Sequence, residues 1–133
     1  MPTYLGSCLC KQVTFELTCE FKGFYLCHCS RCRKKSGSAH GANLFSTSTS
    51  FTWLSGQDGI KLFNVPGTRF ETTFCTNCGS VLPTVKADGS VVTPAGSLDS
   101  EVKIRPYYHI FMGSKADWDY DFASVPTSDT FPK

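Results

Sequence analysis

The sequence predicts a mainly β fold, made of packed antiparallel sheets with one or two short helical turns and stapled by bound metal. Short segments rich in β-branched and aromatic residues alternate with turn residues along the chain. Only one stretch has clear helix signals. Seven of the eight cysteines fall into three tight groups with the spacing of metal ligands. At 133 residues we expect one domain, residues 1–133.

The expected strands are short and are separated by glycine and proline. Turn residues lie at 56–59, 66–67, 88–89 and 94–96. The strands expected between them are 13–17, 24–26, 42–45, 51–54, 60–63, 69–74, 81–85, 91–92 and 107–112.

The clearest helix signals surround residues 31–35. Ser30 is the expected N-cap, and Gly37 stands where a left-handed residue ends a helix. Ser114 is a candidate cap for a second short turn that runs to Trp118. The polar, proline-containing segment 119–133 is expected to form a C-terminal strap, laid over the sheet by its aromatic side chains. These aromatic residues are Trp118, Tyr120, Phe122 and Phe131.

The composition is that of a globular protein, with 41% hydrophobic residues. The N-terminus lacks a signal-peptide pattern, and no stretch approaches the ~20 apolar residues of a membrane helix. We therefore expect a cytoplasmic protein without a membrane partner, whose cysteines bind metal rather than form disulfides. The formal charge is +2; seven thiolates and two Zn²⁺ would bring it to −1, so the charge gives no reason to expect nucleic-acid binding.

One cysteine set is expected to form a closed zinc site. Cys75 and Cys78 flank a tight turn in which Gly79 lets the backbone fold toward the sulfurs. Cys8 and Cys10 supply the other two sulfurs, from a bend before the first expected strand. Four thiolates leave no open position, so this site is predicted to be structural.

A second set, Cys27, Cys29 and Cys32, offers three sulfurs and has no matching fourth cysteine. Three protein ligands and one exchangeable position are typical of a catalytic zinc. The basic residues that follow favour thiolates and would attract an anionic ligand, although a solvated helix face is an equally good interpretation. They are Arg31, Arg33, Lys34 and Lys35.

The three histidines and the eighth cysteine leave alternatives open. In an extended segment the alternation of side chains points His28 away from the sulfurs, but ligation by His28, His40 or His109 would make the second site structural. Of the three histidines, His40 is the best-placed candidate for a proton donor near the metal. The alternative, an ordinary surface or hydrogen-bonded histidine, is the more common case. The apolar strand around His109 predicts a core histidine. Cys19 has no partner cysteine and is expected to be a small buried hydrophobe.

Taken in order, these motifs resemble the glutathione-dependent formaldehyde-activating enzyme family, which includes centromere protein V. The resemblance rests on Gly-Ser-Cys8-Leu-Cys10, Cys27-His-Cys29-Ser-Arg-Cys32-Arg-Lys, Cys75-Thr-Asn-Cys78-Gly-Ser, Ala95-Gly-Ser-Leu-Asp99 and Pro106-Tyr-Tyr-His-Ile-Phe. It implies a β-tent fold, a structural zinc on the four-cysteine set and a catalytic zinc on the three-cysteine set. It also implies conversion of formaldehyde and glutathione to S-hydroxymethylglutathione.

The first functional hypothesis is therefore a zinc-dependent carbon–sulfur lyase or synthase acting on a thiol–aldehyde adduct. Its partners would be a small thiol such as glutathione and a small aldehyde, with the carboxylates of glutathione held by Arg31, Arg33, Lys34 or Lys35. The second hypothesis is a non-enzymatic zinc module that binds a partner through exposed aromatic residues. The third is a redox or metal-transfer switch that holds zinc transiently.

Overall fold

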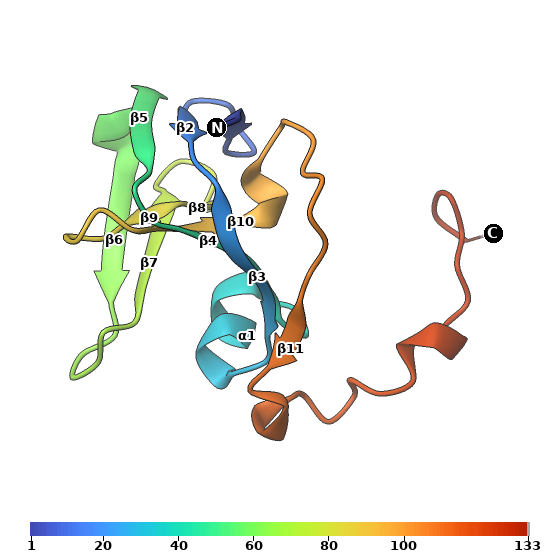
Figure 1. Ribbon diagram of the computed structural model, residues 1–133. Coiled ribbons are helices and arrows are strands. Elements are labelled where there is room, and N and C mark those ends of the chain that lie inside the picture. The colour runs from blue at the N-terminus through green and yellow to red at the C-terminus, as the bar shows by residue number, and fades with distance from the viewer. Residues whose placement is uncertain (133) are drawn as a thin grey trace.

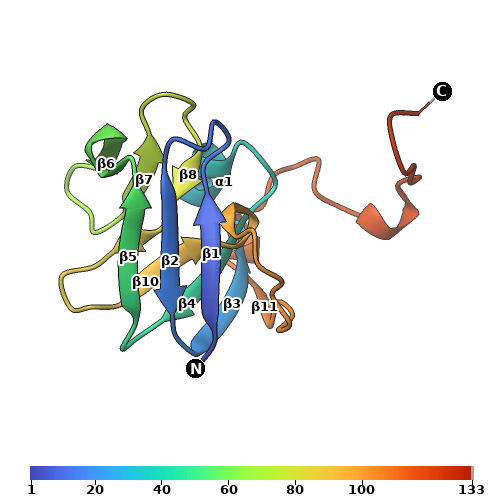
Figure 2. The same ribbon diagram turned by 90° about the horizontal axis from the view of Figure 1, so that it is seen from above.

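The computed structural model describes residues 1–132, so Lys133, the last residue of the expected strap, lies outside them. The chain forms three β-sheets that pack side by side (Figures 1 and 2). A three-stranded sheet contains β1 (Thr3–Ser7), β2 (Thr14–Thr18) and β5 (Ser50–Ser55). A second has the order β6 (Ile60–Asn64), β7 (Glu71–Cys75), β8 (Val81–Leu82). The five-stranded sheet has the order β11 (Tyr108–Ile110), β3 (Phe21–Cys27), β4 (Gly41–Ser46), β10 (Val91–Pro94), β9 (Thr84–Val85).

The mainly β prediction is confirmed, with two differences in the strands. The bend expected before the first strand instead follows a strand, β1, which pairs antiparallel with β2. The strand expected over 81–85 is broken at Pro83 into β8 and β9, since proline has no amide hydrogen to donate to a sheet. All pairings are antiparallel except that β11 runs parallel to β3.

The core forms where the sheets meet, and alternation along β2 shows how. Phe15 and Leu17 are fully buried while their neighbours are half-exposed. The Phe15 ring packs against Phe51 at 5.6 Å and Trp53 at 5.9 Å between centroids. A side chain at Gly6 would collide with the Phe15 ring, which explains the glycine in β1. The core cluster contains Cys8, Val13, Phe15, Leu17, Cys19, Cys75 and Leu82.

The α-helix α1 (Ser30–Ser36) begins one residue away from its expected cap. Cys29, not Ser30, is the N-cap, and its Sγ accepts a hydrogen bond from the Cys32 amide at 3.3 Å. Sulfur can replace the usual hydroxyl here because the side chain of Cys29 already faces the first turn. At the other end Gly37 has φ 68° and donates its amide to the Arg33 carbonyl, as predicted.

The remaining helical turns are 3₁₀ and short. They are η1 (Gln57–Gly59), η2 (Ala95–Ser97), η3 (Met112–Ser114) and η4 (Phe122–Ser124). The turn expected to run from Ser114 to Trp118 instead ends at Ser114, where η3 closes. No helix within residues 1–132 has the length and apolar character needed to cross a membrane.

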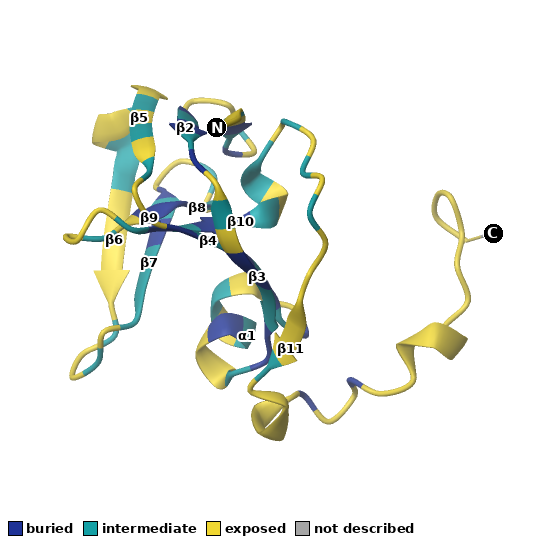
Figure 3. Ribbon diagram, viewed as in Figure 1, coloured by how far each residue is buried: buried dark blue, intermediate teal, exposed yellow. Residues whose placement is uncertain are grey.

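The C-terminal strap does not cover the sheet. Residues 120–132, which we call the C-terminal arm, run away from the three sheets (Figure 1) and are exposed throughout (Figure 3). Tyr120 is 72% exposed and Phe131 is 88% exposed. Ala116 and Asp119 are the last buried residues before the arm, so the chain is anchored there and not by its aromatic side chains.

Candidate metal centres

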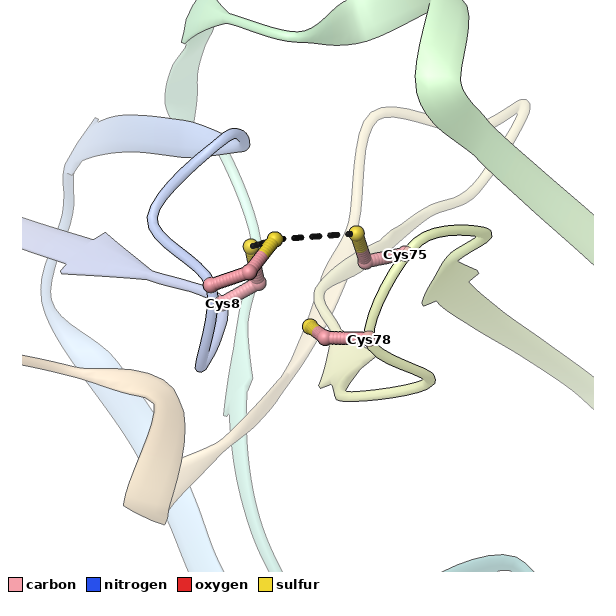
Figure 4. A group of neighbouring side chains, drawn as sticks. Cys8, Cys75 and Cys78 are labelled. Atoms are coloured by element: carbon pink, nitrogen blue, oxygen red, sulfur yellow. Dashed lines mark hydrogen bonds between the residues drawn. The ribbon is translucent and has the colours of Figure 1, made fainter.

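The first centre gathers four cysteine sulfurs from two distant parts of the chain. Cys8 and Cys10 follow β1, Cys75 ends β7 and Cys78 follows it; the side chains converge on one point (Figure 4). All four sulfurs lie within 4.8 Å of one another, with 3.5 Å between Cys8 and Cys10 and 3.9 Å between Cys10 and Cys75. A tetrahedral site with metal–sulfur bonds of ~2.3 Å needs sulfurs about 3.8 Å apart. The donor set therefore fits a closed four-thiolate zinc site.

Hydrogen bonds and the turn geometry of the local backbone position these four sulfurs without a bound metal. Gly79 has φ 77°, and its amide donates to the Cys75 carbonyl at 2.8 Å, so the predicted turn is present. The Val13 amide donates to Cys8 Sγ at 3.3 Å. The hydroxyl and amide of Ser80 lower the pKa of Cys78 to about 5, which favours the thiolate that a metal requires.

The second centre gathers three sulfurs where β3 runs into α1. Cys27 ends the strand, Cys29 caps the helix and Cys32 lies in its first turn. Their sulfurs lie within 4.8 Å of one another, and within residues 1–132 no histidine or carboxylate joins them. Asn43 on β4 donates its side-chain amide to Cys32 Sγ at 3.8 Å, a contact that sequence reasoning missed. Three donors and a free side fit an open metal site.

A cation would stabilise these three sulfurs as thiolates in their buried surroundings. Burial, and then the neighbouring Cys27 sulfur, raise the pKa of Cys32, and burial raises the pKa of Cys27. Three thiolates so close together therefore repel one another unless a positive charge lies between them. A divalent metal removes that repulsion, so the chemistry of the donor set agrees with its geometry.

A cavity of about 470 Å³ opens directly on the three sulfurs. Its walls carry four cationic side chains, Arg31, Lys35, Arg69 and Lys86, and three phenylalanine rings, Phe45, Phe70 and Phe111. Lys35 Nζ lies 5.7 Å from the Phe70 ring centre, and Lys86 Nζ lies 3.1 Å from the Glu71 carboxylate. The cavity thus combines sulfur donors with positive charge and aromatic surface.

Only part of the basic run on α1 faces this cavity. Arg31 and Lys35 line it, whereas Arg33 and Lys34 line neither this cavity nor the second one described below. Arg69 and Lys86 arrive from the approach to β7 and from beyond β9. They carry no local signal in the sequence, because only the packing of the sheets brings them to the cysteines.

His28 and His109 form a hydrogen-bonded pair behind the sulfurs. His28 is buried, its Nε2 lies 2.8 Å from His109 Nδ1, and its Nδ1 lies 2.9 Å from Asp119 Oδ2. Within residues 1–132, His28 Nδ1 and Asp119 Oδ2 have no polar partner other than each other. His28 therefore points away from the sulfurs, as alternation predicted. The expectation of a core histidine fails for His109, which is exposed on β11 because that strand lies at the edge of its sheet.

His40 packs near this pair and does not line the sulfur cavity. Its ring centre lies 5.0 Å from that of His28 and 6.3 Å from that of His109. Burial, and then the neighbouring histidines, lower the pKa of His40, so its ring is neutral near pH 7. Cys19 is fully buried, which confirms it as a small core hydrophobe.

Comparison with protein families places these centres in context. The model of the family described as glutathione-dependent formaldehyde-activating enzyme matches residues 3–114, which include all seven clustered cysteines. The chain belongs to this family. The match ends before Asp119, so the partner of His28 and the C-terminal arm lie beyond the matched part.

One curated relative and one solved structure extend the comparison. An uncharacterised lyase of Schizosaccharomyces pombe is 33% identical over 82 residues, which are 62% of this chain. The aligned part spans only 57% of that protein's length. A crystal structure of a Rhodobacter sphaeroides protein matches with a TM-score of 0.58 at 18% identity, covering 78% of this chain and 98% of that one. That likeness shows a shared fold.

Proposed function

We propose that this family member is a zinc-dependent carbon–sulfur lyase or synthase that joins a small thiol to an aldehyde and reverses the reaction. One observation carries the proposal: three cysteine sulfurs, with no fourth protein donor in the described chain, line a cavity whose walls are cationic. The family match and the lyase name of the yeast relative support the reaction class. In this proposal zinc occupies both cysteine sets, one structural and one catalytic.

The reaction is an addition without net oxidation or reduction. The thiol sulfur forms a bond to the carbonyl carbon, the carbonyl π electrons move to the oxygen, and that oxygen takes up the proton that the thiol loses. The reverse reaction breaks the carbon–sulfur bond and regenerates both reactants. Bound zinc would supply the Lewis acidity that lowers the pKa of the thiol.

The side chains of the cavity suit glutathione as the thiol. Arg31, Lys35 and Arg69 offer positive charge to its carboxylates, while Glu71 already pairs with Lys86. Cys27, Cys29 and Cys32 would hold the metal at the inner end of the cavity. Because Arg33 and Lys34 lie outside the lining, we leave them out of this binding role.

The eight free thiols support a reducing compartment, and we propose the cytoplasm.

One observation favours the alternative of a partner-binding zinc module, namely the exposed aromatic residues of the C-terminal arm. That alternative needs a histidine as the fourth ligand of the second centre. His28 and His109 instead form a hydrogen bond with each other, and His28 lies against Asp119.

Exchange spectroscopy tests the proposed reaction. Carbon-13 formaldehyde and glutathione at equilibrium with their adduct exchange at a rate that NMR measures directly. We expect the zinc-loaded protein to raise this rate at least tenfold above the uncatalysed rate. Cys27→Ser should abolish the gain, whereas Cys19→Ala, which removes a cysteine outside both centres, should keep it. An exchange rate equal to that without protein would refute the proposal.

A further inference from the structure

A second cavity lies on the other side of Cys32. It has a volume of about 590 Å³ and shares three lining residues, Cys32, Lys35 and Asn43, with the sulfur cavity. Cys32 is thus the one member of the three-cysteine set that lines both cavities. A molecule bound at the three-cysteine centre would therefore have a cavity on either side of Cys32.

Small residues create the space in the second cavity. Gly41 and Ala42 at the start of β4, and Gly96 in η2, contribute almost no side chain to its walls. A Cβ added at Gly96 would meet no atom within 4 Å, and this glycine lacks a left-handed backbone. The space at Gly96 is therefore not required for the fold.

The polar groups of this cavity include both hydrogen-bond acceptors and donors, since the Asp99 carboxylate, serine hydroxyls and the ammonium groups of Lys11 and Lys35 all line it. The Ser7 hydroxyl donates to Asp99 at 2.7 Å, the Ser36 hydroxyl to the His40 carbonyl at 3.1 Å, and the Ser97 hydroxyl to the Pro94 carbonyl at 2.7 Å. A hydroxyl has a single hydrogen, so these three hydroxyls can only accept from a ligand, and Ser7 and Ser36 already accept once, from Lys11 Nζ at 3.5 Å and from the Ser38 amide at 3.2 Å. With the Asp99 carboxylate as acceptor and the two lysines as donors, the lining suits a ligand that carries hydroxyl groups, because a hydroxyl both donates and accepts hydrogen bonds.

We propose that the second cavity binds the substituent of an aldehyde larger than formaldehyde, one of several carbons that carries hydroxyl groups. This inference rests on the proposed function and names its second substrate. Formaldehyde has no substituent and would leave the cavity unused, whereas 590 Å³ falls within the ~300–1,000 Å³ of ordinary ligand pockets. The thiol occupies the sulfur cavity, the substituent occupies the second cavity, and the new carbon–sulfur bond forms between them beside Cys32.

The test is the affinity of the zinc-loaded protein for thioethers that mimic the adduct. S-Methylglutathione, S-propylglutathione and S-(2,3-dihydroxypropyl)glutathione differ only in the group that would enter the second cavity. We expect the dihydroxypropyl compound to bind at least tenfold more tightly than the methyl compound and several-fold more tightly than the propyl compound, since its hydroxyls add hydrogen bonds that the other two compounds lack. Isothermal titration calorimetry measures all three.

A pair of glycine variants locates the effect. Gly96→Leu should remove the advantage of the dihydroxypropyl compound, because leucine fills the cavity. Gly113→Leu should keep it, since Gly113 also has open space around its Cβ but lines neither cavity. A wild-type crystal soaked with the dihydroxypropyl compound should show the substituent beside Gly96, which makes the test independent of how the variants fold.

The outcomes separate this inference from the proposed function. If S-methylglutathione binds and the larger compounds bind no more tightly, the inference is overturned and the proposed function stands. An advantage that survives Gly96→Leu, or a substituent seen elsewhere in the crystal, also overturns it. If S-methylglutathione does not bind at all, the proposed function fails and the inference fails with it.

Discussion

At the scale of single residues, two neighbouring lysines of α1 differ in what they face. Lys35 is half-buried, contacts the Phe70 ring and lines both cavities, whereas Lys34 is exposed and lines neither. Burial lowers the pKa of Lys35, so holding its charge in this place has a cost that a solvated lysine does not bear. We infer that Lys35 recognises an anion and that the exposed Lys34 has no part in this recognition.

Substituting these lysines in turn tests that division. Lys35→Met should raise the KM for glutathione at least tenfold, because a charge-assisted hydrogen bond to a carboxylate contributes about 1.5–3 kcal/mol. Lys34→Met makes the same chemical change on the same helix and should leave the KM within about twofold. Equal KM values for the two variants would contradict the assignment. Steady-state kinetics with glutathione varied at fixed aldehyde gives both values.

At the scale of elements, β11 connects the sulfur cavity to the histidine pair. This strand lies parallel to β3, and the Ile110 carbonyl accepts the His28 amide at 2.9 Å. The next residue, Phe111, and Ser114 of η3 line the sulfur cavity. Phe111 has φ 57°, a left-handed backbone uncommon for a bulky residue, so the chain turns sharply at the cavity wall. The His28–Asp119 contact then holds the far end of this segment.

Neutralising that contact should loosen the cavity wall. Asp119→Asn removes the negative charge 2.9 Å from His28 Nδ1, and weakening a buried polar contact costs about 1–3 kcal/mol. Hydrogen exchange at the His28 amide should therefore accelerate about tenfold or more. Asp117→Asn is the matched control, since Asp117 is exposed and makes no hydrogen bond within the described chain. Equal protection in the two variants would show that β11 docks without the buried carboxylate.

At the scale of the whole molecule, the four-cysteine centre joins two sheets. Cys8 follows β1 of the first sheet, and Cys75 ends β7 of the sheet that also holds β6 and β8. Both sulfurs belong to the hydrophobic core cluster. Metal bound there would cross-link sheets whose strands are far apart in sequence, and its binding free energy would add to folding stability.

Cysteine variants at the two centres should therefore differ in stability. Cys75→Ser should lower the Tm of the zinc-loaded protein by roughly 10 °C or more, which corresponds to a loss of about 3 kcal/mol or more. Cys27→Ser is the matched control, because Cys27 and Cys75 are both buried and each variant places a serine hydroxyl in a buried position. Cys27→Ser should lower the Tm much less than Cys75→Ser. Differential scanning calorimetry measures both. A larger loss for Cys27→Ser would reverse the roles of the two centres.

The three cysteine groups could be predicted from the sequence because cysteine spacing is a local property, and the convergence of Cys8 and Cys10 with Cys75 and Cys78 was inferred from the need for four ligands. Cys75 and Cys78 with Gly79, and Cys27 with Cys29 and Cys32, each fold within a few residues. The strands were also predicted, apart from β1 and the break at Pro83, since alternation and turn residues are local as well.

The remaining features depend on which distant segments meet. Arg69, Lys86 and Asn43 reach the sulfurs only when β4, β7 and β9 are assembled. His109 is exposed on the edge strand β11 and Asp119 is buried, and neither residue carries a local signal for its place. The aromatic residues of the C-terminal arm were expected to cover the sheet, but the last buried residues before the arm are Ala116 and Asp119.

In the proposed function, the four-cysteine centre is closed and the three-cysteine centre keeps an exchangeable position. Cobalt substituted for zinc reports this directly, because the visible absorption of Co²⁺ changes when a ligand enters its coordination sphere. Addition of glutathione to the cobalt-loaded protein should change the spectrum of one metal ion per chain, and Cys75→Ser and Cys27→Ser variants should assign that change to the three-cysteine centre. A spectrum that glutathione leaves unchanged would contradict the account.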